Sequence, residues 1–218
     1  MYIDEYNNQM IGNKTLIGLT GTYCAGKNHV ALLLEQRLFP VLDLDKVGHG
    51  IIEMEKERLI ARFGGDILGS DGYIDRKRLG NKVFGKPKEL AALEDIIHPG
   101  VNRETIVWIN SRKEQICVIN AALLHRSSVF DALDTVIIVE APFLVRLLRA
   151  RKRDRLPWLS LLKRFSSQGK FNSQYFKENT DIYKVGNSGF FGFREHFLRE
   201  KLEKRIDVIL SCQGNNRV

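Results

Sequence analysis

The sequence LIGLTGTYCAGKN, residues 16–28, decides the fold of this chain. Its first five residues form a short apolar run, which is typical of a buried parallel strand. Residues 21–27 fit the pattern G-x-x-x-x-G-K, and the following VALLLEQRL has the character of a helix. Between a strand and a helix, the N–H groups of such a loop and the helix N-terminus point at a bound anion, and the lysine adds a positive charge. The stretch therefore predicts a nucleotide phosphate site; the alternative is a chance Gly-Lys turn.

Two residues of this loop leave alternatives open. The residue after Lys27, where Ser or Thr commonly gives a hydroxyl ligand to Mg²⁺, is Asn28. An amide carbonyl is also a hard oxygen ligand, so Asn28 is compatible with Mg²⁺ binding. Cys24 is ordinarily a small packed residue. Because it lies beside a helix N-terminus and a lysine, the alternative is an oxidisable thiol with a lowered pKa.

Length and composition bound the class of protein. A chain of 218 residues predicts one domain, or one core with inserted subdomains. The net charge of +8 favours polyanionic ligands, and nucleic acid, phosphorylated metabolites and acidic membranes all qualify. Residues 1–10 do not resemble a targeting signal, and no apolar run approaches the length of a membrane span. Three widely spaced cysteines argue for reduced thiols, so we expect a cytoplasmic protein without disulfides or a zinc site.

The segment FPVLDLD, residues 39–45, predicts a second strand that ends in carboxylates. Since side chains alternate along a strand, Asp43 and Asp45 are expected on the same side. Ligands of doubly wound α/β proteins bind beyond the carboxyl ends of the parallel strands, so these aspartates would face the phosphate loop. The alternative is an N-cap role, because aspartate before a helix is common.

The rest of the chain predicts a layered α/β core with a helical insertion. Apolar, β-branched runs predict further strands at residues 115–120 and 135–139, and a short last strand at 181–185. Residues 61–114 are helical, with helices expected to start at Asp75, Pro87 and Pro99. This block is too long for a simple crossover, so it predicts a substrate-covering subdomain. The core then comprises residues 15–60, 115–145 and 180–210.

An arginine cluster follows the predicted fourth strand. A run of charges is usually a solvated helix face, but Arg149 and Arg153 are four residues apart and share one side of a helix. Arginines on a mobile helix over a phosphate site neutralise charge in phosphoryl transfer. Residues 146–170 are therefore predicted to form a lid, with a second helix after Pro157 that brings Arg164 and Gln168 to one side. Residues 193–210 predict an amphipathic C-terminal helix.

Several of these segments together resemble the dephospho-CoA kinase family. The resemblance covers about residues 16–188, and its segments are GLTGTYCAGK, VLDLDKVGHGII, FGGDILGSDGYIDRKRLGNKVF, LEDIIHPGV and VIIVEAP. The part from FGGDIL to HP is the most specific, because other P-loop kinases lack it. The resemblance implies a three-layer P-loop kinase fold with a parallel sheet of about five strands. It also implies ATP-dependent phosphorylation of the ribose 3′-hydroxyl of dephospho-CoA, with Mg²⁺ as the cofactor.

The resemblance also implies roles for individual residues. Those expected to bind ATP are Gly21, Tyr23, Cys24, Ala25, Gly26, Lys27, Asn28, Arg149 and Arg164. Those expected to act in catalysis are Lys27, Arg149, Arg153 and Asp45, which matches the general base of the family. Those expected to bind dephospho-CoA are Asp45, His49, Phe63, Arg76, Leu79, His98 and Pro99. Asn28 is the expected metal ligand.

The chain departs from the family pattern at two places. The usual loop GGIGSGKS or GGIGSGKT differs here at Thr22, Cys24, Ala25 and Asn28, and a positive φ at Thr22 or Cys24 would cost about 1 kcal/mol each. The family segment PLLFE appears as ALLHR, residues 122–126, so Arg126 reverses the charge of its last member.

Two other functions stay open from the sequence. One is another P-loop nucleotide or small-molecule kinase, against which the FGGDIL to HP segment argues. The other is a catalytically impaired protein that binds nucleotide or nucleic acid, favoured by the positive charge and the altered loop. Against it, the basic residues cluster where a lid is expected and an aromatic RNA-binding signature is lacking. We therefore expect ATP and dephospho-CoA as partners, no nucleic acid or membrane, and a monomer or small homo-oligomer.

Overall fold

The computed structural model describes residues 14–158, 161–162, 165, 180–188, 200, 203–204, 206–208 and 211. Within these residues the chain forms a five-stranded parallel sheet with the order β2-β3-β1-β4-β5. The strands are β1 (Thr15–Gly21), β2 (Val41–Asp43), β3 (Ile116–Asn120), β4 (Thr135–Glu140) and β5 (Asp181–Gly186). The predicted parallel sheet of about five strands is confirmed.

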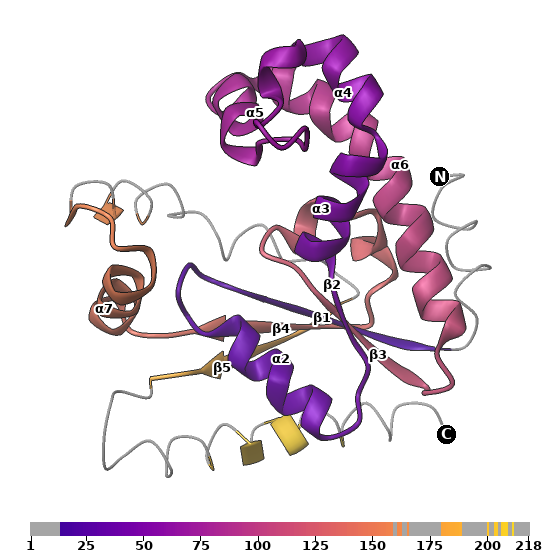
Figure 1. Cartoon of the computed structure of the whole chain (residues 1–218). Coiled ribbons are helices and arrows are strands. Elements are labelled where there is room, and N and C mark those ends of the chain that lie inside the picture. The colour runs from indigo at the N-terminus through magenta and orange to yellow at the C-terminus, as the bar shows by residue number, and fades with distance from the viewer. Residues whose placement is uncertain are drawn as a thin grey trace.

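Helices cover both faces of the sheet, which makes three layers (Figure 1). The helix α2 (Lys27–Gln36) packs on one face and buries Val30, Leu33 and Leu34. On the other face lie α3 (Leu44–Met54) and α6 (Pro87–Ser111). The strand β1 is buried along all seven of its residues, as a central strand between two helical layers must be. The remaining long helix, α7 (Phe143–Asp154), follows β4 at the carboxyl edge of the sheet.

A second hydrophobic cluster lies outside the sheet. It belongs to residues 56–96, here called the helical unit, which lies above the sheet in Figure 1. The unit contains α4 (Lys56–Phe63), the 3₁₀ turn η1 (Gly65–Ile67), α5 (Arg76–Val83) and the first part of α6. Its buried side chains are Leu59, Phe63, Ile67, Ile74, Leu79 and Val83. Asp75 caps α5 by accepting hydrogen bonds from the N–H groups of Lys77 and Arg78, as predicted.

Two predicted boundaries are wrong. The second strand ends at Asp43, not at Asp45, because the Asp43 carboxylate accepts hydrogen bonds from the N–H groups of Asp45 and Lys46 and so starts α3. A new helix does not begin at Pro99, since α6 continues through it. Pro99 removes one hydrogen bond of the helix, and at the next residue α6 packs closely on α3: a Cβ on Gly100 would lie 2.8 Å from Ile51.

The ends of the chain are described only in part. Ile206 is buried in the cluster under α2, and Asp207 accepts a hydrogen bond from Arg37 at 3.0 Å. Arg164, Gln168 and most of the predicted C-terminal helix lie outside the described residues.

The short 3₁₀ turns η2 (Leu124–Arg126) and η3 (Ser128–Ala132) join β3 to β4. Among the helices that the structure describes, none is both long and apolar enough to cross a bilayer.

Candidate active site

The loop between β1 and α2 has the backbone of an anion site. Gly26 is the N-cap of α2 with a left-handed φ of 94°, and no side chain caps the helix. The first turn of α2 also carries no acidic residue, so no carboxylate there cancels the partial positive charge of its free N–H groups. Cys24 has a φ of 59°, a backbone conformation that favours glycine. Thr22 does not have a positive φ. The departure from the family pattern therefore carries backbone strain at Cys24.

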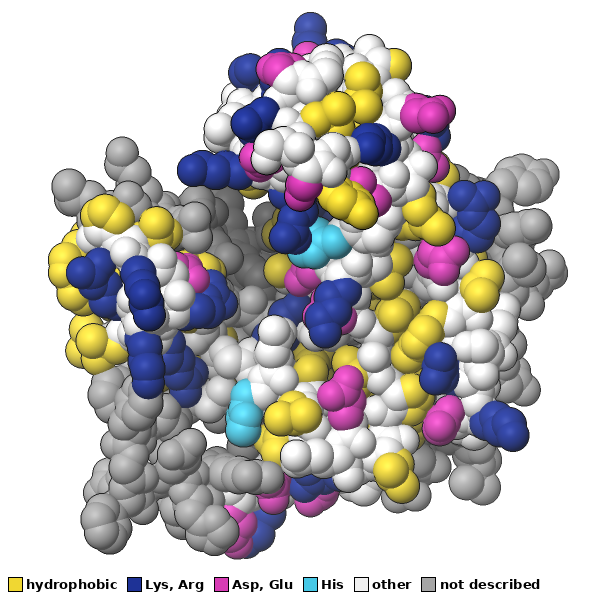
Figure 2. All heavy atoms as spheres, in the orientation of Figure 1, with side chains coloured by type: hydrophobic (Ala, Val, Ile, Leu, Met, Phe, Trp, Pro, Cys, Tyr) yellow, Lys and Arg dark blue, Asp and Glu magenta, His cyan; other side chains and the backbone are white. Residues whose placement is uncertain are grey.

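A cavity of about 780 Å³ opens on this loop. Residues 21–28 line it together with Asp45, Ala122, Arg149, Lys152 and Arg153. Figure 2 shows that Lys and Arg side chains gather on α7, which contributes the last three of these residues. The cavity thus combines an uncapped helix N-terminus with cationic side chains from a second helix. Both features favour a polyanion.

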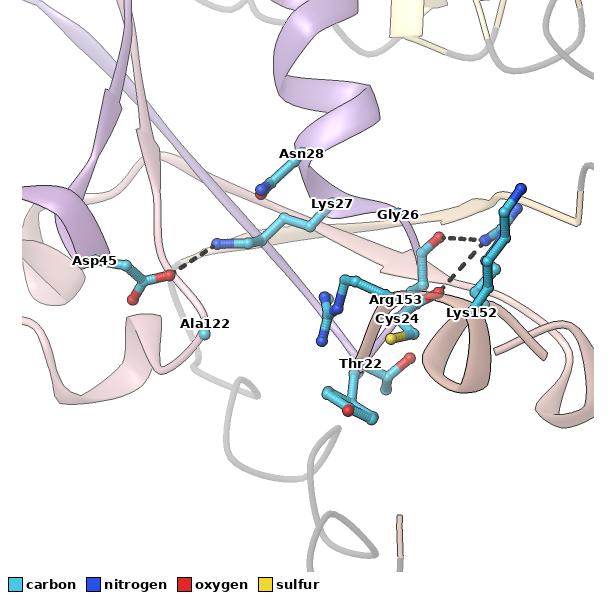
Figure 3. Close-up of a pocket in the computed structure, with 13 residues that line it drawn as sticks. Thr22, Cys24, Gly26, Lys27, Asn28, Asp45, Ala122, Lys152 and Arg153 are labelled. Atoms are coloured by element: carbon cyan, nitrogen blue, oxygen red, sulfur yellow. Dashed lines mark hydrogen bonds and ion pairs between the residues drawn. The ribbon is translucent and has the colours of Figure 1, made fainter. Parts of the chain in front are cut away.

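Lys27 and Asp45 point toward each other across the cavity, from the start of α2 and the first turn of α3 (Figure 3). The Lys27 Nζ atom lies 3.4 Å from Asp45 Oδ2. Lys27 is largely buried, whereas half of the Asp45 side chain is exposed. Asp43 serves as the cap of α3, and Asp45, two residues later in the first turn, presents its carboxylate to the phosphate loop. The arrangement can hold an anion beside the ammonium group and accept a proton at the carboxylate.

The two arginines of α7 that line the cavity are held differently. Arg149 donates through Nη1 to the carbonyl oxygen of Ala25 at 3.0 Å and to that of Cys24 at 3.5 Å. Burial lowers the pKa of the Arg149 guanidinium. Arg153 pairs with Asp154, with 2.7 Å between Nε and Oδ1, and this hydrogen bond raises its pKa. Both arginines therefore lie at the cavity, and each already has partners in the loop or the lid.

Tyr23 connects the loop to the end of α7. Its hydroxyl donates to Asp154 Oδ2, and the Arg153 guanidinium stacks 5.1 Å from the centre of its ring. Phe165 packs edge-on against the same ring at 5.3 Å. The sequence predicted Tyr23 only as a phosphate-loop residue and did not indicate its contacts with α7 and with Phe165.

The structure disfavours the alternative of an activated Cys24 thiol. Burial raises the pKa of this thiol, and this effect outweighs the opposing influence of Arg153 and Arg149. A protonated thiol is a poor nucleophile, so Cys24 acts as a small packed residue of the loop.

The residues predicted to bind the acceptor lie in different surroundings. Of the seven, Asp45 lines the cavity on the phosphate loop and the other six do not. His49 of α3 and Arg76 of α5 are both exposed and in contact, with 2.8 Å from Arg76 Nη1 to each ring nitrogen. In contrast, Phe63 and Leu79 are 7% and 2% exposed within the cluster of the helical unit, where they hold its helices together.

The remaining two lie on α6. His98 is half-buried and Pro99 is exposed, both at the middle of this helix. Arg126, the residue whose charge is reversed relative to the family pattern, forms an ion pair with α6, since its Nη1 atom lies 2.7 Å from Glu94 Oε1. This ion pair joins the turn after β3 to the helical unit.

The oxygen donors at the loop suit Mg²⁺. Asn28 and Asp45 both line the cavity, and Mg²⁺ commonly takes one or two protein oxygens together with phosphate oxygens and water. In the part of the chain that the structure describes, no three His, Cys, Asp or Glu side chains form an all-protein metal cluster. The donor set therefore fits a metal that arrives with a nucleotide.

Sequence reasoning missed two residues at this site. Lys152 lines the cavity from α7, although it was not among the predicted site residues. Asn187 follows β5 and binds the loop, with 2.9 Å from its Nδ2 to the carbonyl oxygen of Ala25. The signal that could have found it is the polar residue directly after the last parallel strand, at the edge where ligands bind.

Comparison with known proteins agrees with this architecture. The family model described as dephospho-CoA kinase matches residues 15–183. The chain belongs to the dephospho-CoA kinase family. The dephospho-CoA kinase of Treponema pallidum is 31% identical over 209 residues, which cover 91% of this chain and 95% of that relative. The dephospho-CoA kinase of Treponema denticola is 31% identical over 202 residues, with 87% and 90% covered.

Solved structures of other proteins share the fold of this chain. A crystal structure of a Thermus thermophilus protein superposes with a TM-score of 0.76 at 28% identity, covering 91% of this chain and 97% of that one. The dephospho-CoA kinase of Campylobacter jejuni superposes with a TM-score of 0.57 at 22% identity, covering 91% and 98%, which supports the fold alone.

Proposed function

We propose that this enzyme transfers the γ-phosphoryl group of ATP to the ribose 3′-hydroxyl of dephospho-CoA, giving coenzyme A and ADP. The observation that carries the proposal is the pair Lys27–Asp45, 3.4 Å apart at a cavity with an uncapped helix N-terminus. Membership of the dephospho-CoA kinase family supports the choice of acceptor.

The phosphate loop and α7 supply the nucleotide side of the reaction. Residues 21–28 hold the ATP phosphates through backbone N–H groups, and Lys27 neutralises the β- and γ-phosphates. Arg149 and Arg153 offset the charge that develops on the transferred group. Arg149 is placed for this by its contact with the Ala25 carbonyl of the loop, and Arg153 by its pair with Asp154. Arg164 completes the nucleotide side, although it lies outside the described residues.

Asp45 and the helical unit supply the acceptor side. The Asp45 carboxylate accepts the proton of the attacking hydroxyl, and half of its side chain is open to an incoming substrate. His49 and Arg76 together present a positive, hydrogen-bonding surface for an anionic part of dephospho-CoA. Phe63 and Leu79 act indirectly, by packing the unit that carries Arg76. His98 and Pro99 line the approach from α6.

Mg²⁺ would be held by Asn28 together with the ATP phosphates, and it would supply charge neutralisation there. The cytoplasm is the proposed compartment, which the unpaired thiols of Cys24 and Cys117 support.

The proposal is tested by coupled measurement of ADP release with dephospho-CoA, set against a panel of nucleoside monophosphates. We expect release with dephospho-CoA only, and none from a Lys27→Ala variant, which loses the single loop cation that reaches the phosphates. Faster release with a nucleoside monophosphate would contradict the acceptor. ATP binding without release for any acceptor would favour an impaired nucleotide-binding protein.

A further inference from the structure

Asn187 holds together three elements of the nucleotide site. It is the first residue after β5, and its own N–H donates to the Glu140 carbonyl at 2.7 Å, so its backbone is fixed at the end of the sheet. Its Nδ2 donates to the carbonyl oxygen of Ala25 at 2.9 Å, and its Oδ1 accepts from Arg149 Nη2 at 3.4 Å. One amide therefore connects the phosphate loop and α7 to a rigid strand.

The contact with Ala25 fixes a peptide plane of the loop. Arg149 Nη1 also donates to this carbonyl oxygen, at 3.0 Å. In a trans peptide, C=O and N–H point in opposite directions. Holding the Ala25 carbonyl toward Asn187 and Arg149 therefore turns the N–H of Gly26 away from them. The neighbouring N–H of Ala25 already donates to the Thr22 carbonyl at 2.9 Å, so the Gly26 N–H is the one whose direction this contact governs.

Steric fit supports the same contact. A Cβ on Gly26 would lie 2.1 Å from Asn187 Nδ2, so the amide occupies the space that a side chain would take. Asn187 does not line the cavity itself. It therefore acts through the loop and Arg149, not by touching the nucleotide phosphates.

We infer that Asn187 is a positioning residue for triphosphate binding: it aims the Gly26 N–H at the phosphates and keeps Arg149 beside the loop. The inference rests on the proposed use of the cavity for ATP, but not on the identity of the acceptor. A donor is required toward Ala25 and an acceptor toward Arg149. The amide of asparagine provides both.

Two substitutions separate these roles. Asn187→Ala removes both contacts, whereas Asn187→Asp keeps the size and the acceptor but loses the donor and sets a carboxylate against the Ala25 carbonyl. The control is Ser188→Ala, a change at the next, exposed position. Calorimetric titration with ATP and with inorganic tripolyphosphate measures the affinity without any need for turnover. Melting temperatures are recorded on the same samples.

We expect both Asn187 variants to bind ATP and tripolyphosphate about tenfold more weakly, as the loss of one or two hydrogen bonds predicts. Asn187→Asp should be at least as weak as Asn187→Ala, and Ser188→Ala should match the parent. Affinities within twofold of the parent for a folded Asn187→Asp protein would overturn the inference. So would a lowered melting temperature with unchanged affinity, which is the result of a purely structural role. If Asn187→Ala does not fold, the isosteric Asn187→Asp decides.

This experiment is independent of the proposed acceptor. A parent protein that binds ATP but does not phosphorylate dephospho-CoA would refute the proposed function, while the comparison of Asn187 variants would stand.

Discussion

Cys24 and Thr22 occupy the same loop but have different backbone requirements. The left-handed φ of 59° at Cys24 is one that glycine adopts without steric cost, and Thr22 has no such angle. The sequence raised the question of strain at both positions, and the structure assigns it to Cys24. The direction of the pKa shift of the Cys24 thiol could not be predicted, because this pKa depends on burial by residues distant in sequence.

Cys24→Gly should be more stable than Thr22→Gly by about 1 kcal/mol. Both changes add the same freedom to the unfolded chain, but only Cys24→Gly relieves a left-handed conformation. Urea unfolding of the two variants gives the comparison, with the parent as reference. Equal free energies of unfolding, or a less stable Cys24→Gly protein, would mean that the loop is not strained at this residue.

The predicted acceptor residues illustrate what residue patterns can and cannot give. Resemblance to the family marked His49, Arg76, Phe63 and Leu79 together, yet the first two are exposed and in contact while the last two are buried in the helical unit. The family pattern marks positions where the residue type matters for the protein. It does not tell whether a residue matters because it binds the ligand or because it packs in the core, since that depends on its tertiary contacts.

Among the elements, the central strands were predicted almost to the residue, because buried apolar runs bounded by turns have few alternatives. The boundaries that failed depend on side chains. Asp43 ends β2 by capping α3, the alternative that the sequence left open, and α6 continues through Pro99 and packs on Ile51 of α3 at Gly100. The contact between α3 and α6 joins residues distant in sequence, so a local pattern does not reveal it.

The ion pair between Arg126 and Glu94 links the turn after β3 to α6, and we expect it to be a charge-dependent contact. Reversing one partner, in Arg126→Glu or Glu94→Arg, should lower the free energy of unfolding by up to about 1 kcal/mol, since the pair is partly exposed. The double reversal should restore most of this loss. Urea unfolding of all four proteins forms a double-mutant cycle.

A matched control is the pair Arg62–Glu89, which lies within the helical unit at 2.8 Å with similar exposure. Its reversal should give a comparable coupling energy. Additive effects at Arg126 and Glu94, with no recovery in the double reversal, would show that the two charges do not interact in solution.

For the whole molecule, the alternation of strands and helices predicted a parallel sheet, and the strand order places β1 between β3 and β4. This order puts the phosphate loop at the middle of the carboxyl edge, with β2 and Asp45 to one side and α7 to the other. The sequence indicated the elements of this arrangement. The 3.4 Å approach of Lys27 to Asp45 joins residues 18 apart in sequence, and the contact of Asn187 with Ala25 joins residues 162 apart, so both depend on how the elements pack.

The central claim is that the carboxylate facing Lys27 takes part in the reaction. The single-turnover rate of Asp45→Asn with saturating ATP and dephospho-CoA tests it most directly, measured with the melting temperature of the same sample. The control is Asp43→Asn, because asparagine also caps helices well, so this variant should stay folded and react at nearly the parent rate. We predict that Asp45→Asn melts like the parent but reacts about 10²–10⁴-fold more slowly, the usual worth of a general base. A stable Asp45→Asn protein that phosphorylates dephospho-CoA at the parent rate would contradict the account.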